Sequence, residues 1–130
     1  MTYKMFYELI PAEALERLKE NYRKNLARER ERLAPIDFHP VLKLWLPTGR
    51  AIWLVTEYDE DTASLFGLCD PGLGFPELGY ISLDELQTIV GPCGVHADRD
   101  STFIASRPLS EYAEEARCRG YIETFEKKGA

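Results

Sequence analysis

Three short apolar segments joined by tight turns constrain the fold of this chain more than any other feature. VLKLWLP (41–47), RAIWLVTE (50–57) and SLFGLCD (64–70) are rich in the β-branched, aromatic and aliphatic residues that favour strands. PTG joins the first two segments and the acidic turn YDEDT joins the last two. Connections this short bring the chain back antiparallel to itself. The sequence therefore predicts a three-stranded antiparallel β-meander over residues 41–70.

Helical patterns lie on both sides of this meander. Pro11 begins a stretch whose apolar residues recur at helical spacing, which predicts a long amphipathic helix over 11–33. A capping-box sequence, S-x-x-E, predicts a short helix over 83–90. Pro108 precedes a third helical stretch and a glycine follows it, so we expect a helix over 109–119.

We expect these elements to form a single α+β domain over residues 1–130. A chain of this length buries enough surface for one hydrophobic core without staples. Additional strands are predicted near 102–105 and in YIETF (121–125), so the antiparallel sheet should have about four or five strands. The long N-terminal helix, the short middle helix and the C-terminal helix would pack against this sheet.

A Gly/Pro-rich loop over 71–79 invites a comparison with phosphate-binding loops. A dinucleotide fingerprint needs G-x-G-x-x-G, but Glu77 stands where the third glycine should be, and no lysine follows. The carboxylates of Asp70 and Glu77 would also repel a pyrophosphate. We interpret the segment as a compact loop, with a recognition loop anchored by an exposed Phe75 as the alternative. The side chains expected to hold the loop to the core are Leu73, Phe75 and Leu78.

The charges of the chain are distributed unevenly. From Ala51 to Asp98 there is no Lys or Arg, while nine acids occur. Such a stretch repels phosphates, so direct nucleic-acid binding is not expected, and the charge favours a protein partner with a basic surface. Carboxylates placed where phosphates would sit would compete for a nucleic-acid-binding site. The residues predicted to contact the partner are Glu57, Asp59, Glu60, Asp61, Asp70, Leu73, Phe75 and Glu77.

The residues nearest to a metal site are Cys93, His96 and Asp98, which lie close together in the sequence. A structural zinc site normally has two paired ligand clusters, and only one pair is present here. We therefore assign no metal, no cofactor and no catalytic residue. Two alternatives stay open: a small metal-dependent hydrolase that uses Asp70, Glu77, His96 and Asp98, and a structural subunit that forms homodimers through the 11–33 helix.

Cysteine usage and hydropathy bear on the compartment. The three cysteines are odd in number and far apart, and no C-x-x-C occurs, which fits a reducing environment. No apolar run approaches the roughly 18 residues of a membrane span, and the N-terminus lacks the pattern of a secretory signal. We expect a cytoplasmic protein without membrane contact.

Several segments together resemble a known bacterial family. AIWLVTEYDED, GPCGV and PLSEYAEEARCRGYI flank a more specific motif, FGLCD-x-G-x-G-x-PELGY-x-SL-x-EL. The pattern over about residues 9–122 resembles the family described as domain of unknown function 2958. The resemblance implies an accessory role on plasmids and other mobile elements, often beside antirestriction, replication and partition genes, and it supplies no catalytic residues. We expect a non-enzymatic protein of such an element that binds a protein partner and inhibits a host nucleic-acid-handling or defence system.

Overall fold

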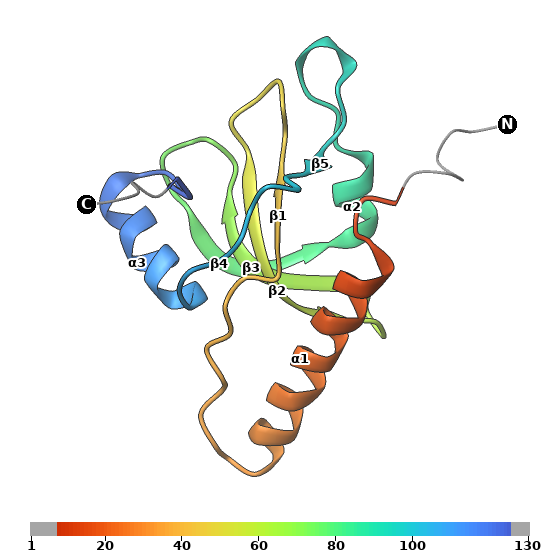
Figure 1. The fold of residues 1–130 in the computed structure, drawn as a ribbon, viewed down its shortest axis with the longest axis vertical. Helices are drawn as coiled ribbons and strands as arrows, with labels where there is room; N and C mark the ends of the chain where they lie inside the picture. Colours follow the sequence, from red (N-terminus) through yellow and green to blue (C-terminus); the bar gives the residue numbers. More distant parts are fainter. Residues whose placement is uncertain (1–7, 126–130) are drawn as a thin grey trace, which may run out of the picture.

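The computed structural model describes residues 8–125, which form an α+β fold around one antiparallel sheet (Figure 1). Two helices lie on one side of the sheet and the third lies on the other. No helix in the described part of the chain is both long and apolar enough to cross a membrane. The helices and strands are α1 (Ala12–Arg30), β1 (Leu42–Trp45), β2 (Ile52–Asp59), β3 (Ser64–Asp70), β4 (Glu77–Ser82), α2 (Leu83–Thr88), β5 (Asp98–Arg99) and α3 (Leu109–Arg119).

The sheet has five strands in the order β4-β3-β2-β1-β5, and all neighbours are antiparallel. The predicted meander is confirmed, because β1, β2 and β3 pair in sequence order. Strand β4 was not predicted: the Gly/Pro-rich loop ends at Pro76, and the next six residues pair with β3. Tertiary pairing overrides the weak local preference of ELGYIS, which contains a glycine and begins with a glutamate.

The strands predicted at 102–105 and 121–125 are wrong. Both segments are irregular in structure, although some of their residues pack against the core beside α3. In and next to these segments, backbone amides form hydrogen bonds with side chains and not with a neighbouring strand. The amide of Ser106 donates to the Tyr112 hydroxyl at 3.2 Å, and the amide of Ile122 donates to a side chain of β3 at 3.1 Å.

The observed bounds of the helices agree closely with those predicted from the sequence. The C-terminal helix has the predicted bounds, and Gly120 closes it in the left-handed region. Helix α2 is shorter than expected and begins after Ser82, whose hydroxyl accepts a hydrogen bond from the Glu85 amide at 3.2 Å. The first helix ends at Arg30 rather than at residue 33, because Arg32 turns into the left-handed region with φ 59°.

The two faces of the sheet carry separate hydrophobic clusters. The α1 face includes Leu44, Trp53 and Val55 and is covered by α1 and α2. The α3 face includes Leu54 and Leu68 and is covered by α3. Adjacent residues of β2 point to opposite faces, so this central strand contributes to both clusters. Because α3 is short, it leaves part of its face of the sheet uncovered, and this part forms the site described next.

Candidate functional site

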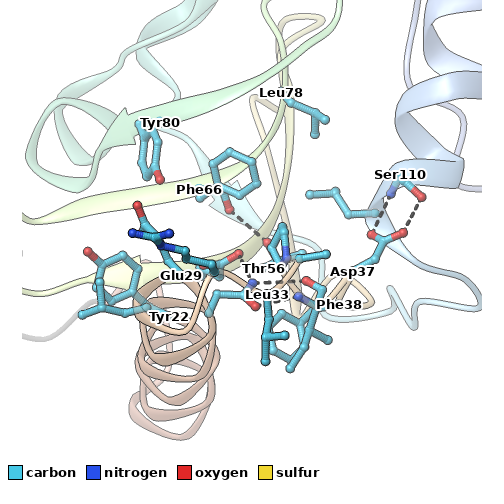
Figure 2. A pocket seen from close by; sticks show the side chains of 18 residues that line it. Tyr22, Glu29, Leu33, Asp37, Phe38, Thr56, Phe66, Leu78, Tyr80 and Ser110 are labelled. Atoms are coloured by element: carbon cyan, nitrogen blue, oxygen red, sulfur yellow. Dashed lines mark hydrogen bonds between the residues drawn. The ribbon is translucent and has the colours of Figure 1, made fainter.

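A groove of about 720 Å³ opens on the uncovered part of the α3 face (Figure 2). Strands β2, β3 and β4 form its floor, the C-terminal half of α1 and the connector 31–38 form one wall, and the start of α3 borders it. The apolar stripe of the first helix contributes to it: Leu18 is buried in the core, whereas Tyr22 and Leu26 line the groove. The apolar stripe of the first helix thus faces the chain's own core and groove.

The floor of the groove carries a row of three side chains across three strands: Glu57, Phe66 and Tyr80. The register places Glu57 opposite Phe66, and Phe66 opposite Tyr80. The two rings pack with their centroids 5.1 Å apart at an interplanar angle of 57°. Tyr80 is 68% exposed, so the open end of the row is an aromatic ring in contact with solvent.

A β-bulge in β2 directs Glu57 into the groove. The register shifts between Val55 and Glu57, so Thr56 is the additional residue. In a regular strand Glu57 would share the face of Val55, which is fully buried on the α1 face. The additional residue moves Glu57 to the opposite face, where it joins the row. The bulge therefore converts a core position into a groove position.

Asn25 of α1 holds both the wall and the floor of the groove. Its side-chain amide donates to Glu57 Oε2 and to the carbonyl of Ile36, each at 3.1 Å, and its Oδ1 accepts from the Ile36 amide at 2.7 Å. At the other border, the amide and hydroxyl of Ser110 donate to the Asp37 carboxylate (Figure 2). These contacts hold the 31–38 connector in place, with Asn25 of α1 on one side and Ser110 of α3 on the other. The chain's own contacts therefore shape the groove.

The groove has an excess of acidic side chains. Of the described charged residues that line it, Glu29, Asp37 and Glu57 are acidic and Arg32 is basic. Burial raises the pKa of Glu57, and the Asn25 amide only partly offsets this effect. The pKa of Tyr80 is raised by burial and then by the charges of Glu57, Glu29 and Asp59. Several carboxylates therefore act together on the exposed ring.

The other predicted acids near β2 lie in the turn between β2 and β3, beside α1. Glu60 forms ion pairs with Lys19 at 3.2 Å and with Arg23 at 3.4 Å, which neutralise part of its charge. Asp59 accepts hydrogen bonds from the Asp61 amide and the Thr62 hydroxyl, each at 3.0 Å. The turn is thus held by its own carboxylates and by α1, and its side chains face the first helix as well as solvent.

Asp70 is not available to a partner, contrary to the prediction. It is 2% exposed, and both carboxylate oxygens accept backbone hydrogen bonds. Oδ1 accepts from the Gly72 amide at 2.8 Å, and Oδ2 accepts from the Ile122 amide at 3.1 Å. The carboxylate joins the Gly/Pro-rich loop to the segment that follows α3. Sequence reasoning missed this role because the partner lies far away in the chain.

The side chains expected to hold the Gly/Pro-rich loop to the core are exposed instead. Leu73 and Phe75 are each 75% exposed, and Leu78 belongs to β4, where it lines the groove. Buried Pro76 and the Asp70 hydrogen bonds hold the loop, whose glycines at 72 and 74 have positive φ. The loop follows the end of β3 at which β2 begins, so it and the adjacent Glu77 lie at the opposite end of the sheet from the Asp59–Asp61 turn.

The residues of the hydrolase alternative are not brought together. Glu77 is in β4 and Asp98 is in β5, the two opposite edges of the sheet. Cys93 and His96 are exposed in the segment before β5. Over residues 8–125, no group of three or more His, Cys, Asp or Glu residues could hold a metal ion. The acids of the 51–98 stretch do not form one continuous surface.

Of the residues predicted to contact a partner, only Glu57 lies in the groove. Phe66, Tyr80, Asn25 and Asp37 were missed. Tyr80 lies inside the most specific motif of the sequence, and its alternation with Leu78 is the signal that would have indicated a strand surface. Asn25 and Asp37 act through contacts between distant segments, for which the sequence contains no local signal.

We expect the variant Glu57→Gln to gain stability relative to the wild type as the pH rises from about 4 to 7. The pKa of Glu57 in the folded state lies above its ordinary value of 4.5, because burial disfavours the charge. Its contribution to stability is present below 4.5 and is lost as the pH rises through the folded-state pKa. Glutamine avoids this loss and still accepts the Asn25 hydrogen bond. Urea unfolding at several pH values measures the difference.

Glu60→Gln is the matched control with the opposite sign. The Lys19 hydrogen bond lowers the pKa of Glu60, so its contribution is present above the unfolded pKa and is lost as the pH falls. This variant should lose stability relative to the wild type over the same rise in pH. Identical pH trends for the two variants would contradict the burial of Glu57.

The comparisons with known proteins give a family but no activity. A family model described as "Protein of unknown function (DUF2958)" matches residues 9–123, which is most of the chain. No curated protein and no solved structure shows a significant match. The match includes the strands of the groove floor and the helices at its borders.

Proposed function

The chain belongs to the family described as protein of unknown function (DUF2958), and from its groove we propose that it is a non-enzymatic protein that binds a basic segment of a partner protein. The observation that carries the proposal is the row of Glu57, Phe66 and Tyr80 on the groove floor. A carboxylate in one row with two aromatic rings is suited to a Lys or Arg side chain, which gains both charge attraction and cation–π contact.

The energetics of Glu57 support a binding role for this row. Burial raises the pKa of Glu57, so its charge opposes folding at neutral pH. A cation bound in the groove would compensate that charge. Perturbed carboxylates in a cleft are candidates for function on this ground.

The composition of the groove favours protein over nucleic acid. Three acids and one base line it, so phosphates would be repelled. The described residues that line it include no His, the side chain that most often serves as a general base, and the Ser110 hydroxyl donates to the Asp37 carboxylate. The proposal therefore assigns binding and not catalysis to this site.

The wider role is proposed on the family resemblance. It makes the protein an accessory factor of a plasmid or another mobile element, which inhibits a host nucleic-acid-handling or defence system by occupying a basic surface of its partner. The proposal places the protein in the cytoplasm. The free thiols of Cys69, Cys93 and Cys118 support this placement, because they fit a reducing compartment.

The proposal predicts that a lysine-rich peptide binds the purified protein and that Tyr80→Ala weakens this binding about tenfold, since cation–π contact with a tyrosine ring is lost. Tyr80 is mostly exposed, so its truncation leaves the core intact. Isothermal titration calorimetry with a seven-residue lysine-rich peptide measures the affinity, and NMR shift changes locate the binding surface.

Phe125→Ala is the matched control. Phe125 is an aromatic residue that is 78% exposed, and it does not line the groove. We expect this variant to bind the peptide as the wild type does, and a glutamate-rich peptide of the same length not to bind. Equal losses in both variants, or shift changes that avoid the groove, would contradict the proposed function.

A further inference from the structure

We propose that the partner segment binds as an additional β-strand on the free edge of β4, with a Lys or Arg beside Tyr80 and an apolar residue beside Leu78. This inference rests on the proposed function and specifies the form and the sequence pattern of the segment that the groove receives. It follows from three features of the described residues: an unpaired edge, a register that continues into the groove, and the chemistry along that register.

The outer edge of β4 has no strand partner within residues 8–125. β4 is the last strand in the sheet order and pairs only with β3. In an antiparallel sheet about half of the backbone N–H and C=O groups of an edge strand point away from its neighbour. Those groups are available to an extended peptide, which adds main-chain hydrogen bonds in strand addition.

The two edges of the sheet are protected very differently. β5 is only two residues long, Asp98 and Arg99, and both are charged. β4 is six residues long and pairs with β3 without a register shift, so it has no bulge. Its sequence, ELGYIS, contains no Lys, Arg or Pro. Short length, bulges, charged side chains and Pro normally prevent an edge from pairing, and of these features β4 has only the charge of Glu77 at its first residue.

The register defines which incoming side chains would enter the groove. One row on the α3 face runs from Glu57 through Phe66 to Tyr80, and the next runs from Leu54 through Leu68 to Leu78. An added strand lengthens both rows by one residue. Because residues on one face of a strand alternate, the two groove-facing residues of the peptide are separated by one residue, whichever direction the peptide runs.

The chemistry of the two positions differs. Next to Tyr80, the incoming residue meets an exposed aromatic ring on which the charges of Glu57, Glu29 and Asp59 act. A cationic side chain fits this position by cation–π contact and by charge complementarity. Next to Leu78, the row contains only leucines, so an apolar and preferably β-branched side chain fits. The expected pattern is Lys or Arg, any residue, then Val or Ile, in either order.

The test uses the full ¹⁵N-labelled chain and three seven-residue threonine-based peptides. The first carries lysine and valine separated by one residue, the second carries them adjacent so that they face opposite sides, and the third replaces the lysine of the first with glutamate. We expect the first peptide to bind about tenfold tighter than each of the others. Its binding should also slow hydrogen exchange at alternate amides of β4, and Tyr80→Ala should weaken the preference for lysine over glutamate, because the cation–π contact is lost while the carboxylates of the groove remain.

The outcomes separate this inference from the proposed function. If a lysine peptide binds in the groove but the β4 amides exchange as before, strand addition is wrong and the binding function stands. If neither lysine peptide binds, both proposals are wrong. Equal affinity for the first two peptides would contradict the proposed register, in which the lysine and the valine face the same side of the added strand. Protection of β4 in the free protein, together with a dimeric mass in sedimentation, would show that a second copy occupies the edge and would also overturn the inference.

Discussion

Replacing Gly67 with alanine is expected to lower the free energy of unfolding by about 3 kcal/mol or more. Gly67 lies in the middle of β3 on the α1 face, opposite the bulge of β2. A Cβ at this position would come within 2.0 Å of the Leu54 carbonyl oxygen and within 2.9 Å of the Val55 Cα. Both are backbone atoms of the central strand, so no side-chain movement relieves the contact. Urea unfolding followed by the fluorescence of the buried Trp53 measures the loss.

Gly79→Ala is the matched control for this prediction, because Gly79 is the cross-strand neighbour of Gly67 in β4. A Cβ on Gly79 would have no atom within 4 Å. We expect this variant to be as stable as the wild type or up to about 1 kcal/mol more stable, since alanine restricts the unfolded chain. Equal stability of the two alanine variants would show that β2 and β3 do not approach each other closely at the bulge.

Asp70→Asn is expected to lower the free energy of unfolding by about 2 kcal/mol. Asparagine retains one acceptor oxygen, whereas Asp70 accepts from two backbone amides, those of Gly72 and Ile122. The new NH₂ group would face one of these amides and leave a buried donor unpaired. Urea unfolding measures the stability, and hydrogen exchange at residues 72 and 122 identifies which contact is lost.

Asp61→Asn is the control for Asp70→Asn, because Asp61 is an exposed acid in the turn between β2 and β3. It makes the same change of charge, and we expect its effect to stay within about 0.5 kcal/mol of the wild type. A loss of stability as large as that of Asp70→Asn would assign the effect to net charge rather than to the buried hydrogen bonds. Unchanged exchange at Ile122 in the Asp70 variant would contradict the contact itself.

The elements that the sequence predicted correctly are those with strong local signals. The meander has β-branched runs and short turns, and the C-terminal helix has Pro108 before it and Gly120 after it. β4 has only a weak local signal, the alternation of Leu78 and Tyr80, because a glycine and a glutamate occupy the same segment. Its formation depends on the free edge that β3 offers. When pairing with a neighbouring strand decides the structure of a segment, local propensity alone does not predict it.

The candidate site was harder to predict than the fold. Glu57 was named for its charge, but the bulge that turns it into the groove depends on the pairing of β2 with β3. Asp70 carries the same formal charge and is buried, because Ile122, 52 positions away in the chain, supplies one of its donors. The sequence does not show which donors a carboxylate will bind in the folded protein. Its charge alone therefore does not distinguish an acid exposed on the surface from one that is buried and structural.

The single additional residue in β2 also determines which residues of the groove can vary while the fold is kept. Before the bulge, the strand supplies Leu54 and Val55 to the two hydrophobic clusters, so truncating either side chain is expected to destabilise the fold. After the bulge, the α3 face carries Glu57 and its row, which neither cluster needs as a fully buried member. Mutations at Glu57 and Tyr80 can therefore accumulate under selection without a new scaffold. Under the binding function proposed above, point mutations at these positions would change the specificity of the groove while the fold stays the same.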